Sequence, residues 1–539
     1  MTVMKNIKYA KYYLLFIIIS SLFGCTDFDE LNSDPTKSTD MDPNLQIAAV
    51  QVRQTEDHQE WARYLAYPAG FMNQWTGAWG TIEYGGKGKK YDNYLEQMWI
   101  SYYPFIIKNV VDAIQRTKDN PEEINVNSAA RILRVQCFLK ITDMYGDVPY
   151  FDAGMGYYTG IFKAKYDKQE DIYNDFFKEL KEASEALDSN GDLLKYDLYY
   201  NGNIDKWRKF ANSLRLRIAM RLIKVDPDRA KNEAEAAIAA GVFESNDDIC
   251  YIQHENVLNP PDGGGKDGPG NGLATRLLGP EDMSYSDFRV SKELVTEMVN
   301  AKDPRLSYIG RCYYNDGQRT DITDQVKAQL GTYEEMALPA QRFRWDIWTP
   351  PIDITVNGEA VSLEYTLQQL QPSKLLTNFG APYIHVSYAE VAFLQAEAAI
   401  RGWNVGGASA QSLFESGLRA AVSQWSLFGA AAANPDEVDT FVAKNALTAG
   451  NELMQINTQL WVLHILDPIE TWSNWRRTGM PDIQFYNNFP NENQSNGKTP
   501  RRLEYPKEEQ MKNPENYKEA LDRMGGKDDW LTRVWWDKE

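Results

Sequence analysis

Hydrophobic side chains recur every three or four residues over most of the chain. In one segment the recurring positions are Ile172, Phe176, Leu180, Ala183 and Leu187. This spacing places them along one face of an amphipathic helix. The same pattern predicts helices over residues 44–66, 91–117, 128–145, 210–222, 383–402, 408–425 and 451–466. Gly or Pro clusters separate several of these segments, so we expect the helices to pair as hairpins.

One long segment, from about Cys250 to Pro382, interrupts the helical pattern. It contains residues 260–272, whose prolines and glycines no regular element tolerates. Further along, residues 352–356 and 359–363 flank Asn357-Gly358, a pair that supplies the positive φ angles of a type I′ turn. We therefore predict a mainly α-helical protein with a loop-rich insertion and a little β-structure.

The balance of charge excludes one class of partner. The chain of 539 residues carries 76 Asp and Glu against 57 Lys and Arg, a net charge of -19. The negative electrostatic field of such a chain repels the phosphate backbones of nucleic acids, so we expect no nucleic-acid partner. It also argues against adhesion of the body to anionic lipid.

Cysteine and histidine are too sparse to suggest a metal centre. The four cysteines, Cys25, Cys137, Cys250 and Cys312, have no C-x-x-C spacing, and the four histidines lie far apart. Asp262 and Asp267 could offer oxygen ligands to calcium, although aspartates in a Gly-rich loop more often form turns. We expect no metal and no cofactor.

The N-terminus has the pattern of an export signal. Three lysines precede an apolar run of about ten residues, which is too short to span a membrane. The run ends in Leu22-Phe23-Gly24-Cys25, which resembles a bacterial lipobox. We predict a signal peptide over residues 1–24, an acylated Cys25 and an acidic tether over residues 25–42; the alternative is an ordinary cleaved signal with an incidental cysteine.

The sequence contains partial matches to known catalytic motifs, but these lack the flanking structure that the motifs require. The glycine string at residues 263–268 lacks the strand and helix of a dinucleotide fold, Pro500 blocks the helix that should follow Gly497-Lys498-Thr499, and no G-x-S-x-G elbow exists. Glu390 and Glu397 could be a glycosidase pair, but Glu397 precedes Arg401 by four residues, which favours a solvated ion pair on a helix.

Seven strings in order along the chain resemble the SusD/RagB family of outer-membrane lipoproteins of Bacteroidetes. Besides the lipobox they are MYGDVPY at 144–150, WRKFANSLRLR at 207–217, YAEVAFLQAEA at 388–398, WRRTGMP at 475–481, PRRLEYP at 500–506 and VWWD at 534–537. The resemblance implies a SusD-like fold with four degenerate tetratricopeptide-like helix pairs. The arginines of these strings, Arg215, Arg217, Arg476 and Arg477, are expected to brace helix packing.

The resemblance also implies a function and a partner. Family members bind glycans, some bind peptides, and they deliver the ligand to a SusC-like TonB-dependent barrel in the outer membrane without cleaving it. We therefore expect one domain over residues 43–539, divided into a helical part (43–249), a ligand-contact excursion (250–382) and a second helical part (383–539). The lipid anchor would be its membrane attachment at the cell surface, and a peptide binder, a protein scaffold and a helical glycosidase stay as alternatives.

Two loop stretches combine aromatic rings with glycine or turn residues, as sugar recognition requires. The first, WTGAWGTIEYGG at residues 75–86, offers Trp75, Trp79 and Tyr84. The second, RWDIWTPP at residues 344–351, offers Trp345 and Trp348. These five rings are the predicted ligand contacts, and the alternative is that they pin the loops onto the helical core.

Overall fold

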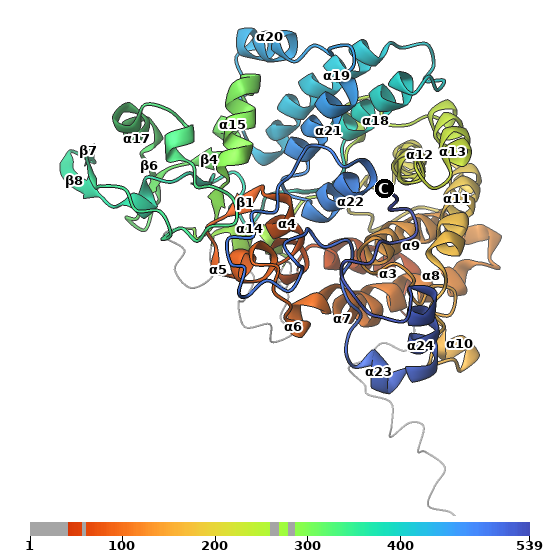
Figure 1. Ribbon diagram of the computed structural model, residues 1–539. Coiled ribbons are helices and arrows are strands. Elements are labelled where there is room, and N and C mark those ends of the chain that lie inside the picture. The colour runs from red at the N-terminus through yellow and green to blue at the C-terminus, as the bar shows by residue number, and fades with distance from the viewer. Residues whose placement is uncertain (1–40, 57–60, 259–268, 279–285) are drawn as a thin grey trace, which may run out of the picture. The chain divides into compact units, whose positions relative to one another are not determined.

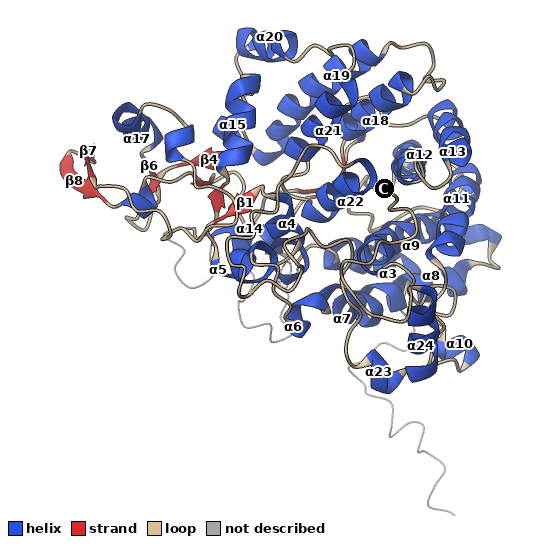
Figure 2. Cartoon of the chain, in the orientation of Figure 1, coloured by secondary structure: helices blue, strands red, loops and turns tan. Residues whose placement is uncertain are grey.

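The computed structural model describes residues 41–56, 61–258, 269–278 and 286–539. Within it, Pro43–Glu539 forms one compact unit. Helices make up most of this unit, and its short strands occur in two-stranded pairs (Figures 1 and 2). The predicted mainly α-helical fold is confirmed. The predicted signal peptide, Cys25 and nearly all of the tether lie outside the described residues.

Consecutive helices pack against one another as hairpins. The pairs are α8 (Lys108–Thr117) with α9 (Ile124–Tyr145), α12 (Ile204–Arg221) with α13 (Pro227–Ala240), α18 (Tyr388–Ile400) with α19 (Ala410–Ser423), and α21 (Glu452–Leu463) with α22 (Pro468–Thr478). Several begin at a side-chain cap, since Asn203, Asp226 and Ser387 each accept a hydrogen bond from the N–H three residues later. The helix α9 ends at Tyr145 because Gly146, with φ +87°, turns the chain.

Other helices flank these hairpins. The helix α11 (Gln169–Ala186) packs on both α9 and α12, and α3 (Pro43–Arg53) packs on α8 and α9. The remaining helices of eight or more residues are α15 (Lys292–Ala301), α17 (Thr323–Leu330), α20 (Pro435–Lys444) and α24 (Pro514–Arg523). Shorter ones are α4 (Pro68–Met72), α5 (Trp79–Thr81), α10 (Gly156–Thr159), α14 (Gly272–Leu278), α16 (Leu306–Ile309) and α23 (Glu509–Lys512).

Three predicted helices have different bounds. Residues 383–402 begin with the strand β10 (Tyr383–Val386) before α18, and residues 44–66 contain α3 and a π-helical turn, η1 (Trp61–Leu65). Residues 91–117 are broken into α6 (Asp92–Leu95), α7 (Gln97–Tyr102), the π-turn η3 (Tyr103–Ile107) and α8. Pro104 lies in η3 and has no N–H, so it interrupts the regular helical hydrogen bonds.

A strand pair joins the two ends of the excursion. The strand β2 (Cys250–Ile252) is antiparallel to β10, with Tyr383 opposite Ile252 and Val386 opposite Cys250. Between them, β3 (Arg289–Val290) pairs with β1 (Trp75–Thr76), β4 (Gly310–Arg311) with β9 (Gln371–Pro372), and β5 (Tyr313–Tyr314) with β6 (Thr320–Asp321). The excursion also holds four of the helices named above, so it is more regular than the sequence pattern indicates.

The predicted hairpin is confirmed. The strands β7 (Ile352–Val356) and β8 (Glu359–Leu363) are paired along their length. Asn357 and Gly358 between them have φ angles of 53° and 87°. Two consecutive positive φ angles are what a type I′ turn requires, and Asn-Gly adopts them at little cost.

Charged side chains pair inside the helical core. Arg477 makes two hydrogen bonds to Glu397, at 2.7 and 2.8 Å, and both side chains are fully buried. Arg217 contacts both oxygens of Glu390 at 2.5 Å. The predicted bracing role of these arginines is confirmed. The Glu397–Arg401 pair also exists, at 2.8 Å, but the prediction that it is solvated is wrong because the Glu397 side chain is fully buried.

Pairing keeps these buried carboxylates ionised. Burial alone would raise the pKa of Glu397, but Arg477 and Arg401 outweigh it and lower the pKa to about 2. Arg217 lowers the pKa of Glu390 in the same way against the effect of burial. Glu390 and Glu397 therefore hold helices together, and neither can act as a catalytic carboxylate facing a cleft.

Candidate ligand-binding surface

Two of the predicted tryptophans, Trp75 and Trp79, have opposite environments. Trp75 in β1 is 1% exposed, and its indole N–H donates to the carbonyl of Ile465 at 2.9 Å. Trp79 begins α5 and is 49% exposed. The expectation that Trp75 contacts ligand is wrong, since its ring lies in the core, whereas Trp79 presents its ring to solvent.

Tyr84 supports the ring of Trp79 from beneath. It is 6% exposed and lies in the π-turn η2 (Ile82–Gly86), with its ring centroid 5.5 Å from that of Trp79. Tyr91 stacks on Tyr84 at 5.4 Å and is itself 45% exposed, and Tyr94 meets Tyr84 edge-on at 4.7 Å. Tyr84 is therefore the buried centre of an aromatic group whose exposed members are Trp79 and Tyr91.

The second predicted stretch also exposes its rings. Trp345 is 48% exposed and Trp348 67% exposed. Trp345 lies parallel to the buried ring of Phe343, with centroids 5.0 Å apart and planes 6° apart. The Asp346 carboxylate accepts the N–H of Phe343 at 3.0 Å, which closes the turn that carries Trp345.

Backbone hydrogen bonds place the two stretches side by side. The N–H of Gly77 donates to the carbonyl of Arg342 at 2.9 Å, and the N–H of Arg344 donates to the carbonyl of Gly77 at 3.2 Å. Gly77 has φ +86°, and a Cβ there would lie 2.8 Å from Asp287 O, so glycine is required for this close approach. Segments about 265 residues apart in the chain thus form one surface.

A third segment, residues 484–494, completes this surface and was missed from the sequence. The ring of Phe489 lies 5.8 Å from that of Phe343, and Tyr486 is 44% exposed. Asn493 donates to the carbonyl of Lys87 at 2.9 Å. The run FYNNFPNEN at residues 485–493 interleaves aromatics with asparagines, so the criterion that found the other two stretches would also have found this one.

Lys87 connects the three segments electrostatically. Its ammonium lies 2.6 Å from Glu83, 2.8 Å from Glu492 and 4.9 Å from the centre of the Phe489 ring. Burial alone would lower the pKa of Lys87, but the hydrogen bonds that Lys87 donates to Glu492 and Glu83 outweigh it and raise the pKa. Lys87 also lowers the pKa of Glu492, with a second contribution from Lys89. Lys87 and Glu492 are therefore both charged at neutral pH.

We name the exposed rings and their supports the aromatic surface. It consists of Trp79, Tyr84, Tyr91, Phe343, Trp345, Trp348 and Tyr486, with Lys87 and Glu492 between them. The ring faces can cover the C–H face of a sugar, while the nearby amides and carboxylates can bind its hydroxyls. In Figure 1 the segments that carry it lie around the labels β1 and α5, where residues 484–494 pass close to residues 75–91.

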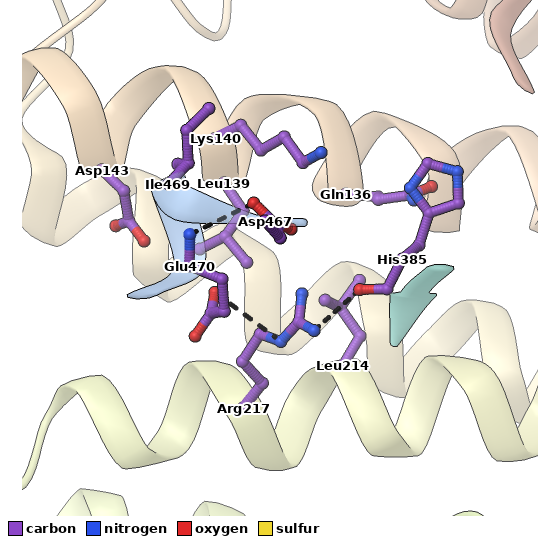
Figure 3. A pocket seen from close by; sticks show the side chains of 10 residues that line it. All are labelled: Gln136, Leu139, Lys140, Asp143, Leu214, Arg217, His385, Asp467, Ile469 and Glu470. Atoms are coloured by element: carbon purple, nitrogen blue, oxygen red, sulfur yellow. Dashed lines mark hydrogen bonds and ion pairs between the residues drawn. The ribbon is translucent and has the colours of Figure 1, made fainter. Parts of the chain in front are cut away.

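The core also contains a small polar cavity, shown in Figure 3. Lys140, Arg217, His385 and Glu470 are among its lining residues, and Arg217 reaches toward Glu470 and donates to the carbonyl of His385 at 2.8 Å. Its volume of about 10 Å³ accommodates roughly one water molecule and no sugar. This cavity belongs to the ion-pair network and is not a ligand site.

No metal cluster or membrane-crossing helix occurs in the part of the chain that the structure describes. Groups of three or more His, Cys, Asp or Glu that could hold a metal ion are absent from those residues. None of the described helices is both long and apolar enough to span a bilayer. Cys137, Cys250 and Cys312 are buried and free.

Known proteins resemble this chain over nearly its full length. A structure named as a chitin-binding protein is 36% identical, covers 92% of this chain and 100% of its own, and has a TM-score of 0.78. A structure named "Bacteroidetes AC2a SusD-like" is 32% identical over 93% of this chain and 100% of its own, with a TM-score of 0.84.

A more distant structure shares the fold. It is a chitin-binding SusD homolog from Flavobacterium johnsoniae, 24% identical over 92% of this chain and 98% of its own, with a TM-score of 0.66. A search of curated proteins finds no match. A SusD-like family model described as "starch-binding associating with outer membrane" matches residues 37–506. With that span and two relatives above 30% identity, the chain belongs to the SusD-like family of carbohydrate-binding proteins that associate with the outer membrane.

Proposed function

We propose that the protein is a surface lipoprotein that binds an oligosaccharide on the aromatic surface and passes it to a SusC-like TonB-dependent barrel without cleaving it. One observation carries the ligand site: two aromatic stretches, each matching sugar recognition in sequence, lie side by side with Trp79, Trp345 and Trp348 exposed. The ion pairing of Glu390 and Glu397 supports binding over hydrolysis, since it removes the proposed glycosidase pair.

The ligand class follows from the surface and from the relatives. Flat rings separated by amides suit an oligosaccharide, and the relative with 36% identity is named as a chitin-binding protein. We therefore propose a chain that contains N-acetylglucosamine as the first ligand to test. Each ring covers roughly 100 Å² of apolar sugar surface, about 2.5 kcal/mol before ordering costs, so binding is expected in the micromolar to millimolar range.

Calorimetry with chitin oligosaccharides and starch oligosaccharides tests the site. Trp79→Ala and Trp348→Ala should each weaken binding of the preferred sugar about tenfold. Met511→Ala is the matched control, because Met511 is 77% exposed and lies in α23, outside the aromatic surface. Unchanged sugar binding in both tryptophan variants would show that the aromatic surface is not the ligand site. A protein that binds neither sugars nor peptides but co-purifies with the barrel would be a scaffold.

A separate experiment tests the anchor. Labelled palmitate should enter the wild-type protein at Cys25, and the Cys25→Ser protein should leave the envelope fraction. A Cys25→Ser protein that fractionates with membranes as before would contradict acylation as the attachment, whatever the sugar measurements show.

A further inference from the structure

Exposed apolar side chains outside the aromatic surface flank α3. Most lie in segments that are hydrogen-bonded around its first turn, and Phe105 lies beside Arg53 at its end. Phe105 lies in η3, Tyr157 in α10 and Phe162 just after it, while Leu193 and Tyr196 lie between α11 and α12. Tyr157 is 91% exposed and Phe162 86% exposed, which is unusual for aromatic rings. Exposed apolar side chains in neighbouring segments are typical of an interaction surface.

Hydrogen bonds tie these side chains to α3 from two sides. The Asp112 carboxylate accepts from Gln46 at 2.5 Å and from the Tyr158 hydroxyl at 2.6 Å, so the α10 loop lies beside the first turn of α3. On the other side, Asn44 accepts the N–H of Lys195 at 3.0 Å. Leu45, which is 45% exposed, lies between Asn44 and Gln46 and points outward, because successive helix positions are about 100° apart.

Lysines accompany the apolar side chains. Lys108, Lys163, Lys165 and Lys195 are exposed, and among the described residues no carboxylate lies within ion-pair distance of any of them. The nearby carboxylate of Asp192 is engaged by the N–H groups of Asn125 and Val126. This face is therefore apolar and carries exposed lysines, with the carboxylates of Asp112 and Glu509 engaged by the hydroxyls of Tyr158 and Tyr166.

We propose that this face, which we name the anchor face, lies against the lipid surface and gives the body a second membrane contact. The inference rests on the proposed acylation of Cys25. Fully extended, residues 25–42 reach at most about 60 Å, and they enter the described body at Pro43, beside Leu45. The anchor face is thus the part of the body nearest along the chain to the bilayer.

The chemistry favours lipid over a protein partner. Tyrosine and phenylalanine rings suit the boundary between headgroups and acyl chains, and lysines extend their ammonium groups to phosphates. The core of a protein interface is instead depleted in lysine. Tethering raises the local concentration of the face at the membrane, so a contact too weak to bind alone becomes populated. The whole-chain charge, which argues against lipid adhesion, does not describe this face.

Lipid contact can be measured without relying on acylation. The chain from residue 26, with a hexahistidine tag in place of Cys25, is attached to phosphatidylcholine–phosphatidylglycerol vesicles that carry nickel-chelating lipid. A polarity-sensitive fluorophore is placed at Tyr157→Cys and, as the matched control, at Trp348→Cys. Labelling is selective because Cys137, Cys250 and Cys312 are buried. Trp348 is also exposed, at 67%, but lies in the aromatic surface.

Spin-labelled lipid should quench the probe at position 157 at least about threefold more strongly than the probe at position 348. With the probe moved to Ile161→Cys, adding Tyr157→Ser and Phe162→Ser should reduce quenching to the level of position 348, while sugar binding is unchanged. Equal quenching at positions 157 and 348 would overturn the lipid contact. So would shielding of the probe at position 157 when the barrel protein is added without any lipid contact. Neither result bears on acylation or on the sugar site.

Discussion

The aromatic surface and the buried ion pairs both depart from the ordinary distribution of side chains, in which apolar groups are buried and charged groups are exposed. At the first, large apolar rings such as Trp348 face water; in the second, Arg477 and Glu397 are fully buried. An exposed ring gains little for stability but is available to a ligand, whereas a buried ion pair is tolerated only when each charge is fully partnered. The comparison suggests that ligand binding and folding depend on separate sets of residues.

The largest effect should come from breaking a buried ion pair. Arg477→Met leaves Glu397 buried with only Arg401 as a charged partner, and should lower the free energy of unfolding by about 3–5 kcal/mol. Urea denaturation measures this. Arg401→Met is the matched control, because Arg401 contacts the same carboxylate from a side chain that is 26% exposed and should cost less than about 1 kcal/mol. Equal losses of unfolding free energy in the two variants would show that burial does not determine how much each ion pair stabilises the protein.

A similar loss should separate Trp75 from Trp79. Trp75→Ala opens a cavity in the core and should lower the free energy of unfolding by about 3–5 kcal/mol. Trp79→Ala removes a half-exposed ring and should change that free energy by less than about 0.5 kcal/mol. Thermal unfolding of both variants tests this pair. A large loss in Trp79→Ala would mean that its ring pins the loop.

The buried carboxylates should make stability depend on pH. Because the pKa of Glu397 falls from 4.5 to about 2 on folding, its contribution is fully present above about pH 4.5 and is lost as the pH falls towards 2. The loss attributable to Glu397 should be on the order of 3 kcal/mol. Denaturation between pH 6 and pH 2 checks it. Arg477→Met should flatten this dependence, and an unchanged slope would contradict the assignment.

A smaller effect should appear where charge and aromatic rings meet. Lys87→Met removes the ion pairs that hold the loop at 484–494 against η2, and should weaken sugar binding by about 1 kcal/mol, or about fivefold. Lys89→Met is the control, because Lys89 contacts the same two glutamates from a more exposed position and should have a smaller effect. Equal weakening in both variants would show that burial of Lys87 does not matter.

The sequence predicts the long helices well, because periodicity reports directly on which face is buried. It predicts bounds poorly where tertiary pairing intervenes: residues 383–386 are apolar enough for a helix, yet they pair with β2. It also cannot tell a solvated ion pair from a buried one, because Glu397 and Arg401 have helical spacing in both cases. The second partner, Arg477, lies on another helix.

For the ligand site, the sequence identifies the chemistry but not the direction in which each ring points. Trp75 and Trp79 are four residues apart in the same glycine-rich stretch, and only strand pairing at β1 directs one of them inward. Nor does local sequence indicate that Gly77 lies against Arg342, since that contact is made by two distant loops. The loop at 484–494 was detectable by the same aromatic and asparagine pattern.

The short pairing of β2 with β10 has a consequence for how such proteins diversify. Because Ile252 and Tyr383 are held opposite each other, the polypeptide leaves the helical body and returns to it at one place. Insertions, deletions or a graft from a relative between these two positions need not shift α12 or α18. Selection can therefore change the excursion, which carries Trp345 and Trp348 of the proposed ligand site, while the surrounding helices stay the same.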